Sequence, residues 1–166
     1  MAAPPPLISA PGFVHRPLNR DDAASLSEAI EESRPCLQRW QGLGDQDGSR
    51  ELCGWRISKW SAAFERRERL QYALVAVDGG ILGGCALEAI DWTALTFQLG
   101  YWLRSSAVGQ GHATGAVQAL TRLAFIDCNA RRVAIWTDVE NTRCIAVARR
   151  AGFVQKGNYV LNASML

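Results

Sequence analysis

The sequence predicts a single α/β domain whose mixed, mostly antiparallel sheet carries helices on both faces. Three observations lead to this fold class. The middle of the chain holds three apolar, alternating segments joined by short turns, which is typical of an antiparallel meander. Helical patterns lie on both sides of that meander in the sequence, and shorter strand patterns lie beyond them. With 166 residues, 48% of them apolar, the chain is long enough for one core.

The N-terminal region predicts a flexible start, a strand and a helix. Residues 1–12 contain three consecutive prolines and no long apolar run, so we expect the single domain to span residues 13–166. Residues 13–18 alternate as a strand does, and Asn19 or Asp21 is a suitable N-cap for the following helix. Pro35 marks either the end of that helix or the start of a short second one.

A loop, a helix and the meander follow. Residues 42–48 are rich in Gly and Asp, which predicts a loop, and residues 50–69 carry apolar side chains at helical spacing. The meander is predicted from three strand patterns, at residues 72–77, 81–90 and 96–103. An Asp-Gly-Gly turn joins the first two strands, as in a β-hairpin.

The C-terminal third alternates helices with short strands. Helical patterns cover residues 111–127 and 140–151, and the second ends at a glycine followed by phenylalanine, a common C-terminal stop. Strand patterns cover residues 132–137, 153–155 and 159–163. Together with the earlier segments they predict a sheet of about six to seven strands.

Composition excludes several function classes. Eighteen Lys and Arg against sixteen Asp and Glu leave a formal charge of +2, too small to predict nucleic-acid binding. The five cysteines are scattered and form no C-x-x-C pair, so we expect free thiols and no metal site. No segment is long and apolar enough to predict a membrane span, and we expect a cytoplasmic protein.

The most informative motif follows the third meander strand. There Gly109-Gln110-Gly111-His112-Ala113 opens a helical pattern, and such a junction offers backbone N–H groups and a helix dipole to a phosphate. A dinucleotide site requires a third glycine where Thr114 stands, and a Walker loop requires Gly-Lys-Ser/Thr, which is absent. Taken by itself, the loop is also consistent with a plain tight turn.

The motifs around this loop identify a family. From about Tyr72 to Val160 the chain resembles the GCN5-related N-acetyltransferase (GNAT) superfamily, and within it the branch named for ribosomal-protein N-terminal acetyltransferases. The resemblance rests on five ordered motifs: GGCALEAIDW at residues 83–92, LGYWL at 99–103, GQGHAT at 109–114, DVENT at 138–142 and AGF at 151–153.

The resemblance implies the GNAT fold and acetyl-coenzyme A as co-substrate. The loop would wrap the pyrophosphate with backbone N–H groups, and the strand end at Trp102 and Leu103 would offer backbone groups to the pantetheine arm. The Leu103 N–H would also stabilise the oxyanion. Asn141 would bind the pantetheine arm, cap the last helix, or do both. The implied cofactor-binding residues are Trp102, Leu103, Val108, Gly109, Gln110, Gly111, His112, Ala113, Thr114 and Asn141.

Two residues depart from the family pattern. Val108 stands where the family usually has Arg or Gln, so we expect the backbone to hold the pyrophosphate, with Arg104, Arg149 or Arg150 as substitutes for the missing charge. Cys144 stands where the family has Ser as proposed general acid for the leaving thiolate, and a thiol can also donate a proton. Alternatively, Cys144 is a small buried apolar residue or an acylated nucleophile.

The general base has several candidates, because attack requires a neutral amine. Strand alternation predicts that Glu88 faces the acceptor groove, as base or acceptor-binding residue, although a surface role is the alternative. Glu28, Glu31 and Glu32 lie on the first helix and either bind a cationic acceptor or form a solvated helix face. His112 is expected to cover the cofactor.

The aromatic residues of the N-terminal half either shape the acceptor site or belong to the core. These are Trp40, Trp55 and Trp60, whereas Trp102 and Trp136 are predicted to be sheet core. The implied activity is direct acetyl transfer to a primary amine, with a protein N-terminus as expected acceptor. Two alternatives stay open: an acceptor that is a small amine (an antibiotic, polyamine or amino acid) and a non-catalytic acyl-coenzyme A-binding module. A homodimer is compatible with the resemblance.

Overall fold

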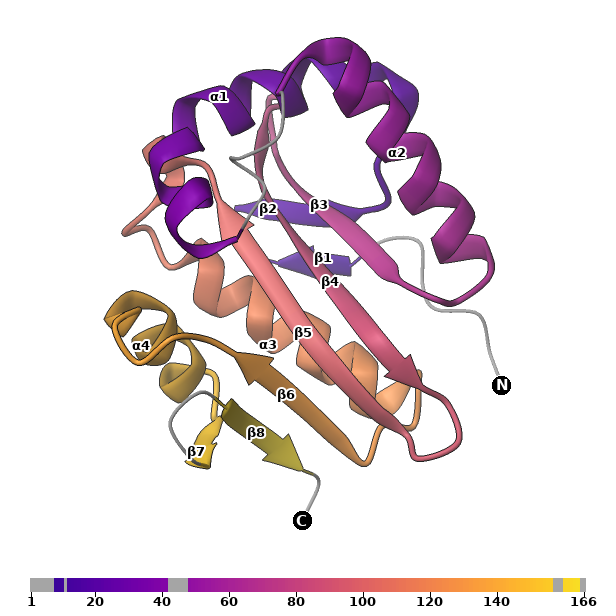
Figure 1. Cartoon of the computed structure of the whole chain (residues 1–166), viewed down its shortest axis with the longest axis vertical. Coiled ribbons are helices and arrows are strands. Elements are labelled where there is room, and N and C mark those ends of the chain that lie inside the picture. Colours follow the sequence, from indigo (N-terminus) through magenta and orange to yellow (C-terminus); the bar gives the residue numbers. More distant parts are fainter. Residues whose placement is uncertain (1–7, 11, 42–47, 157–159, 165–166) are drawn as a thin grey trace.

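In the computed structural model, which describes residues 8–10, 12–41, 48–156 and 160–164, eight strands form one sheet with helices on both faces (Figure 1). The helices are α1 (Ala23–Trp40), α2 (Arg50–Glu65), α3 (His112–Ile126) and α4 (Thr142–Arg150). The strands are β1 (Ile8–Ala10), β2 (Phe13–Arg16), β3 (Leu70–Ala76), β4 (Ile81–Asp91), β5 (Thr96–Leu103), β6 (Arg132–Trp136), β7 (Val154–Lys156) and β8 (Val160–Ser164).

The sheet confirms the predicted class and corrects the number of strands. Its order is β1-β2-β3-β4-β5-β6-β8-β7, and every neighbouring pair is antiparallel except β5 and β6. The prediction of six to seven strands was one too few, because Ile8–Ala10 pair with Phe13–His15. Part of the segment predicted as a flexible start therefore extends the sheet edge, since a short turn lets it fold back on β2. Residues 1–7 and 11 lie outside the described residues.

The first helix differs from both alternatives that were open for Pro35. Asn19 caps a short 3-10 turn, η1 (Arg20–Asp22), which leads directly into α1. Pro35 lies inside α1, which continues to Trp40 instead of ending. Leu37, just beyond the proline, is only 1% exposed. Its burial against the sheet holds the last turns of the helix despite the missing N–H.

Strand alternation divides the core into two layers. One face of the sheet, which includes Phe97 and Leu99, packs against α3 and α4. The opposite face packs against α1 and α2, and Trp102 belongs to that layer. Because successive side chains of a strand point to opposite faces, one central strand supplies both cores. None of the helices in the described ranges is both long and apolar enough to cross a membrane.

The single parallel pair creates an opening in the sheet. β5 and β6 pair only from Thr96 with Arg132 to Gln98 with Ala134. Beyond these residues the two strands separate, and Figure 1 shows them diverging toward α4. The separation exposes strand backbone on the β5 side, which is the feature on which the site is built.

Candidate active site

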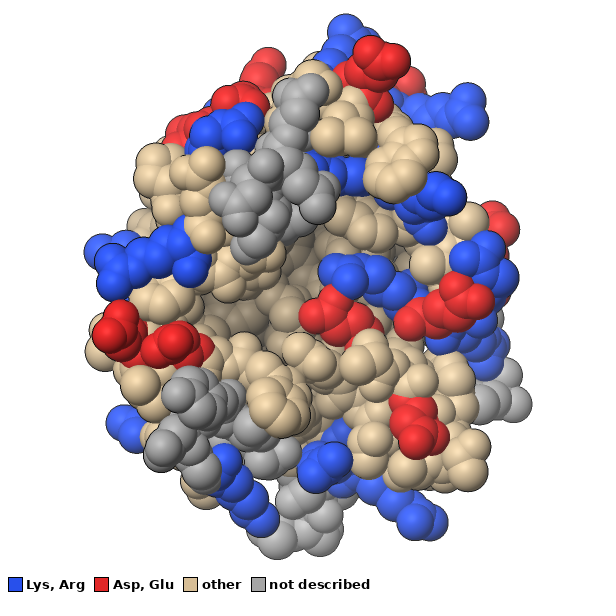
Figure 2. Space-filling view, viewed as in Figure 1, with Lys and Arg blue, Asp and Glu red and all other residues tan. Residues whose placement is uncertain are grey.

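Two cavities meet at β5. The gap cavity, about 270 Å³, lies where β5 and β6 separate and is lined mainly by the β5 and β6 strand ends and the start of α4. The helix cavity, about 350 Å³, lies between α2 and the strands β3, β4 and β5. Gly100, Tyr101 and Gln41 line both cavities, so the two cavities adjoin at this point. The space-filling view shows this face hollowed near its centre (Figure 2).

The register of β5 decides which backbone groups face the gap cavity. Arg104 N–H donates to Leu82 O over 2.7 Å, which sets the hydrogen-bonded phase between β4 and β5. Because hydrogen-bonded pairs alternate in an antiparallel ladder, Tyr101 and Leu103 direct their N–H and C=O groups away from β4. The Leu103 N–H is therefore directed toward the gap side, as the oxyanion role expected for it requires.

The same register corrects the expectation for Trp102. Its backbone belongs to the pair with Gly84 and bonds toward β4 instead of a bound cofactor. Its indole is buried in the layer under α1 and α2 and lines the helix cavity. The predicted core position of Trp102 is thus confirmed. Its side chain lies on the helix-cavity face of β5, because neighbouring residues of a strand point to opposite faces.

The glycine loop has the geometry that a phosphate requires. Gly109 and Gly111 have φ angles of +84° and +82°, and a Cβ at either would meet no atom within 4 Å. No backbone N–H from Gly109 to Thr114 donates a hydrogen bond within the described part of the chain. Free N–H groups at the start of α3, in an open cradle, suit an anion such as pyrophosphate. The residues present therefore fit coenzyme A.

The side chains of the loop take different roles. Val108 is half-exposed, and the Gln110 side-chain amide donates to Ser106 O over 3.1 Å. The His112 ring packs edge-on against Phe13 with ring centroids 5.2 Å apart, which directs it toward β2. The structure therefore gives the imidazole a packing contact with the core, and the cover over the cofactor stays a prediction. Ala113 contributes its methyl group to the core beside α3.

Arg150 is the cation that lies at the loop. Its Nε donates to Thr114 Oγ1 at the first turn of α3 over 3.3 Å. The other two predicted substitutes are engaged elsewhere: Arg104 forms an ion pair with Glu32, and Arg149 donates to Gln155 over 3.0 Å. Of these three arginines, Arg150 is therefore placed best to supply the charge that Val108 cannot.

Asn141 and Cys144 stand at the start of α4, on the wall of the gap cavity. Asn141 Oδ1 accepts from Cys144 N–H over 3.1 Å, which confirms the N-cap role and leaves the side-chain N–H₂ group for a ligand. The Cys144 carbonyl accepts from the Tyr101 hydroxyl at 3.5 Å, and burial raises the pKa of that phenol. The partly buried Cys144 packs against the core under α4 and also borders the cavity.

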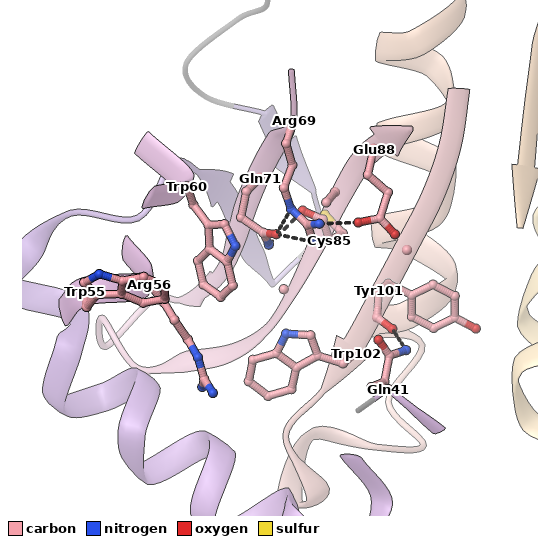
Figure 3. Close-up of a pocket in the computed structure, with 13 residues that line it drawn as sticks. Gln41, Trp55, Arg56, Trp60, Arg69, Gln71, Cys85, Glu88, Tyr101 and Trp102 are labelled. Atoms are coloured by element: carbon pink, nitrogen blue, oxygen red, sulfur yellow. Dashed lines mark hydrogen bonds and ion pairs between the residues drawn. The ribbon is translucent and has the colours of Figure 1, made fainter. Parts of the chain in front are cut away.

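Glu88 faces the helix cavity, as strand alternation predicted (Figure 3). One of its oxygens forms an ion pair with Arg69, whose guanidinium also donates to Gln71 Oε1 over 3.0 and 3.1 Å. The other oxygen faces Gly100, where an added Cβ would lie only 3.1 Å away. A glycine at this position therefore leaves room for the carboxylate at the junction of the cavities.

The remaining acidic and aromatic candidates differ in their contacts. Glu31 pairs with Arg34, Glu32 pairs with Arg104, and Glu28 is exposed without a partner in the described chain. Of the tryptophans predicted to shape the acceptor site, Trp55 and Trp60 line the helix cavity, and Trp40 lines the gap cavity.

Sequence reasoning also misplaced one residue and overlooked others. Trp136, predicted to be sheet core, is 60% exposed and borders the gap cavity, because β6 has no β5 partner there. The overlooked lining residues include Gln41, Arg69, Gln71 and Tyr101. Of these four, only Tyr101 lay within a quoted motif.

Comparisons with known proteins agree with this geometry. Residues 13–154 match the family described as acetyltransferase (GNAT) domain. YdaF of Bacillus subtilis (strain 168), named as a candidate ribosomal N-acetyltransferase, is 28% identical over 143 residues, which are 86% of this chain and 78% of that protein.

Solved structures share the fold. RimL, described as a ribosomal alpha-N-protein acetyltransferase in complex with coenzyme A, aligns with a TM-score of 0.88 at 21% identity, over 96% of this chain and 98% of that one. The microcin self-immunity acetyltransferase MccE, in complex with acetyl-CoA and AMP, aligns with a TM-score of 0.87 at 18% identity, over 94% of each chain. The chain belongs to the acetyltransferase (GNAT) domain family and is an acetyl-CoA-dependent N-acetyltransferase.

Proposed function

We propose that this N-acetyltransferase acetylates the N-terminal amine of a protein. The observation that carries the proposal is the junction of two cavities at Gly100 and Tyr101. One cavity is bordered by Asn141 and Cys144 at the start of α4, and the other is bordered by a carboxylate and aromatic side chains. The names of YdaF and RimL, both referring to ribosomal acetylation, support a protein acceptor.

The cofactor side is formed by backbone groups and one arginine. When bound, acetyl-CoA supplies an activated acetyl group as a thioester. The N–H groups of the loop from Gly109 to Thr114 hold the pyrophosphate, and Arg150 adds positive charge beside it. The Leu103 N–H, directed toward the gap side, stabilises negative charge on the thioester oxygen. Asn141 binds the pantetheine arm through its free side-chain N–H₂ group.

On the acceptor side, Glu88 receives the amine. Its carboxylate lies beside Gly100, where the cavities adjoin, while Arg69 holds the second oxygen. An incoming ammonium group meets a negative charge there and transfers its proton to Glu88, directly or through a water molecule. The neutral amine then attacks the acetyl carbonyl.

The leaving thiolate of coenzyme A requires a proton, and Cys144 supplies it. The residue lies on the wall of the gap cavity, opposite β5. Collapse of the tetrahedral adduct breaks the C–S bond, and the coenzyme A thiolate takes the Cys144 proton. Water accepts the second amine proton and returns one proton to Cys144. The donor and the leaving group are both alkyl thiols, so the transfer between them is nearly balanced. No acylated enzyme is required, because the amine attacks directly.

The experiment that tests the function uses the purified protein with acetyl-CoA and a panel of peptides and small amines. Release of free thiol with a mass increase at a peptide N-terminus supports the proposal. Turnover only with an antibiotic, polyamine or amino acid replaces it with the small-amine activity. Binding of acetyl-CoA without turnover on any amine favours the non-catalytic module.

We further propose that the protein acts in the cytoplasm as a homodimer. β7 forms an edge of the sheet, and its residue Val154 is 64% exposed. An edge strand with unpaired backbone groups is a surface with which a second copy can pair. Analytical ultracentrifugation at micromolar concentration distinguishes the dimer from a monomer.

A further inference from the structure

We propose that Glu32 is a positioning residue for acetyl-CoA, because it clasps the segment that leads into the phosphate loop. It lies on α1, on the acceptor side of the sheet, and is distant in sequence from the loop that it holds. The inference rests on the proposed assignment of residues 109–114 to the pyrophosphate.

Four contacts form the clasp between α1 and η2 (Ser105–Ala107). The Glu32 carboxylate pairs with Arg104 and accepts from the Ser106 N–H over 2.7 Å. The Ser105 hydroxyl donates to Glu32 O at 3.4 Å, and the Ser105 N–H donates to the hydroxyl of the fully buried Ser33 at 3.0 Å. The Ser33 hydroxyl and the Glu32 carboxylate thus accept the backbone N–H groups of Ser105 and Ser106 at the start of η2.

The clasp matters because the next segment is intrinsically loose. Two glycines with positive φ, Gly109 and Gly111, follow within a few residues, and glycine loses more conformational freedom on ordering than any other residue. Val108 offers no charged side chain that could order the loop on a phosphate. Fixing the chain at residues 104–106 reduces the number of conformations that the loop must lose when the pyrophosphate binds.

The Glu32 carboxyl group is negatively charged at physiological pH. The Arg104 guanidinium, helped by donors from Ser106, lowers the pKa of the Glu32 carboxyl to about 2. The carboxylate is therefore ionised throughout the range in which the enzyme works. In the clasp, Arg104 is the partner of Glu32, whereas Arg150 lies at the phosphate loop itself.

The test compares binding of coenzyme A with binding of pantetheine, which lacks the pyrophosphate and the nucleotide. Calorimetry is performed on the wild type, E32Q, R104Q and the double variant. E28Q is the matched control, because Glu28 lies one turn earlier on the same helix and is exposed. Thermal unfolding of each variant shows whether it remains folded.

We expect E32Q to weaken coenzyme A binding by roughly threefold to tenfold, with pantetheine binding and Tm unchanged. R104Q should weaken coenzyme A binding to the same extent, and the double variant no further, because the two residues act as one unit. In turnover, E32Q should raise KM for acetyl-CoA and leave kcat unchanged. E28Q should behave as the wild type.

Three results would overturn the inference. E32Q binds coenzyme A as tightly as the wild type, or more tightly because Arg104 is released to the phosphate, or it loses pantetheine binding to the same degree. If E32Q does not fold, R104Q decides alone by the same comparison of the two ligands. A wild type that binds pantetheine as well as coenzyme A would instead contradict the proposed pyrophosphate site.

Discussion

The side-chain amide of Gln41 donates a 2.7 Å hydrogen bond to the backbone carbonyl of Tyr101. This contact joins the end of α1 to β5 where the two cavities adjoin, and Figure 3 shows the Gln41 side chain reaching the Tyr101 backbone. Tyr101 directs its backbone groups away from β4, so its carbonyl would otherwise have no strand partner. The Gln41 side chain thus supplies a hydrogen-bond donor to the Tyr101 carbonyl on β5, the strand at which we propose that acetyl transfer occurs.

Replacing Gln41 with Ala should raise KM for the acceptor by roughly threefold to tenfold, the range of one lost hydrogen bond. Binding of coenzyme A should change little, because Gln41 bonds to the Tyr101 carbonyl and not to the loop at residues 109–114. Steady-state kinetics at saturating acetyl-CoA measure the effect. Gln38→Ala is the control, because Gln38 is an exposed residue of the same helix. An unchanged acceptor KM would show that the contact has no role in acceptor binding.

Replacing Glu88 with Gln should lower kcat by roughly 100-fold, because the amide keeps the shape of the carboxylate but cannot accept the proton. Glu51→Gln, an exposed change on α2, should leave kcat unchanged. A Glu88→Gln enzyme with wild-type kcat would assign proton transfer to another group.

Replacing Cys144 with Ala should lower kcat at least tenfold, whereas Cys144→Ser should retain much of it because a hydroxyl still donates a proton. Thiol release from coenzyme A, followed spectrophotometrically, measures both variants. The exposed Cys36 provides the control as Cys36→Ser. Full turnover by Cys144→Ala would remove the thiol from the mechanism and leave it as a packing residue.

Replacing Arg150 with Gln should weaken coenzyme A binding by roughly threefold to tenfold, and the loss should shrink as salt concentration rises. Arg149→Gln is the neighbouring control, because the Arg149 side chain donates to Gln155 and not to the first turn of α3. Calorimetry at two ionic strengths makes the comparison. Equal losses from both variants would show that the effect comes from net charge alone.

Replacing Asp22 with Asn should destabilise the fold by about 2 kcal/mol, because Asp22 is buried and pairs with both terminal nitrogens of Arg16, at 2.7 and 2.8 Å. Denaturant unfolding at pH 7 measures the loss. Asp21→Asn, an exposed neighbouring change, should have a much smaller effect.

The effect of Asp22 should depend on pH in a defined direction. Burial alone raises the pKa of Asp22, but hydrogen bonds from Arg16 and from the Asn19 N–H outweigh it, and the pKa is lowered overall. The contribution is therefore complete above the ordinary Asp value of about 4 and disappears as the pH falls through the folded-state pKa. The stabilities of wild type and Asp22→Asn should converge at acid pH; a constant difference down to pH 2 would contradict this assignment.

Local patterns predicted most of the secondary structure. The third meander strand has the predicted bounds, Thr96–Leu103, because its apolar alternation is strong and polar turns flank it. Pro35 shows the limit of such reasoning, since the burial of Leu37 carries α1 through a residue that normally ends a helix. Ile8–Ala10 are a second example, because their strand exists only through pairing with β2.

Some residues of the candidate site were predicted and others were not, again because local patterns do not reveal contacts between distant segments. The glycine loop and Asn141 belong to contiguous motifs, so their local geometry follows from neighbouring residues. The partners of Glu88 and Glu32 are 19 and 72 positions away in sequence, and no spacing rule connects them. Trp136 was misplaced because its exposure depends on where β5 and β6 stop pairing.

The sequence by itself determined the family and the co-substrate, through the resemblance of five ordered motifs, and most of the strands along the chain. The strands follow from apolar alternation, which acts over a few residues. Only the tertiary structure decided that Arg150 lies at the loop, that Arg104 is paired with Glu32, and that Gln41 completes β5. Those relationships depend on how distant segments pack across the sheet, and packing is set by the whole core.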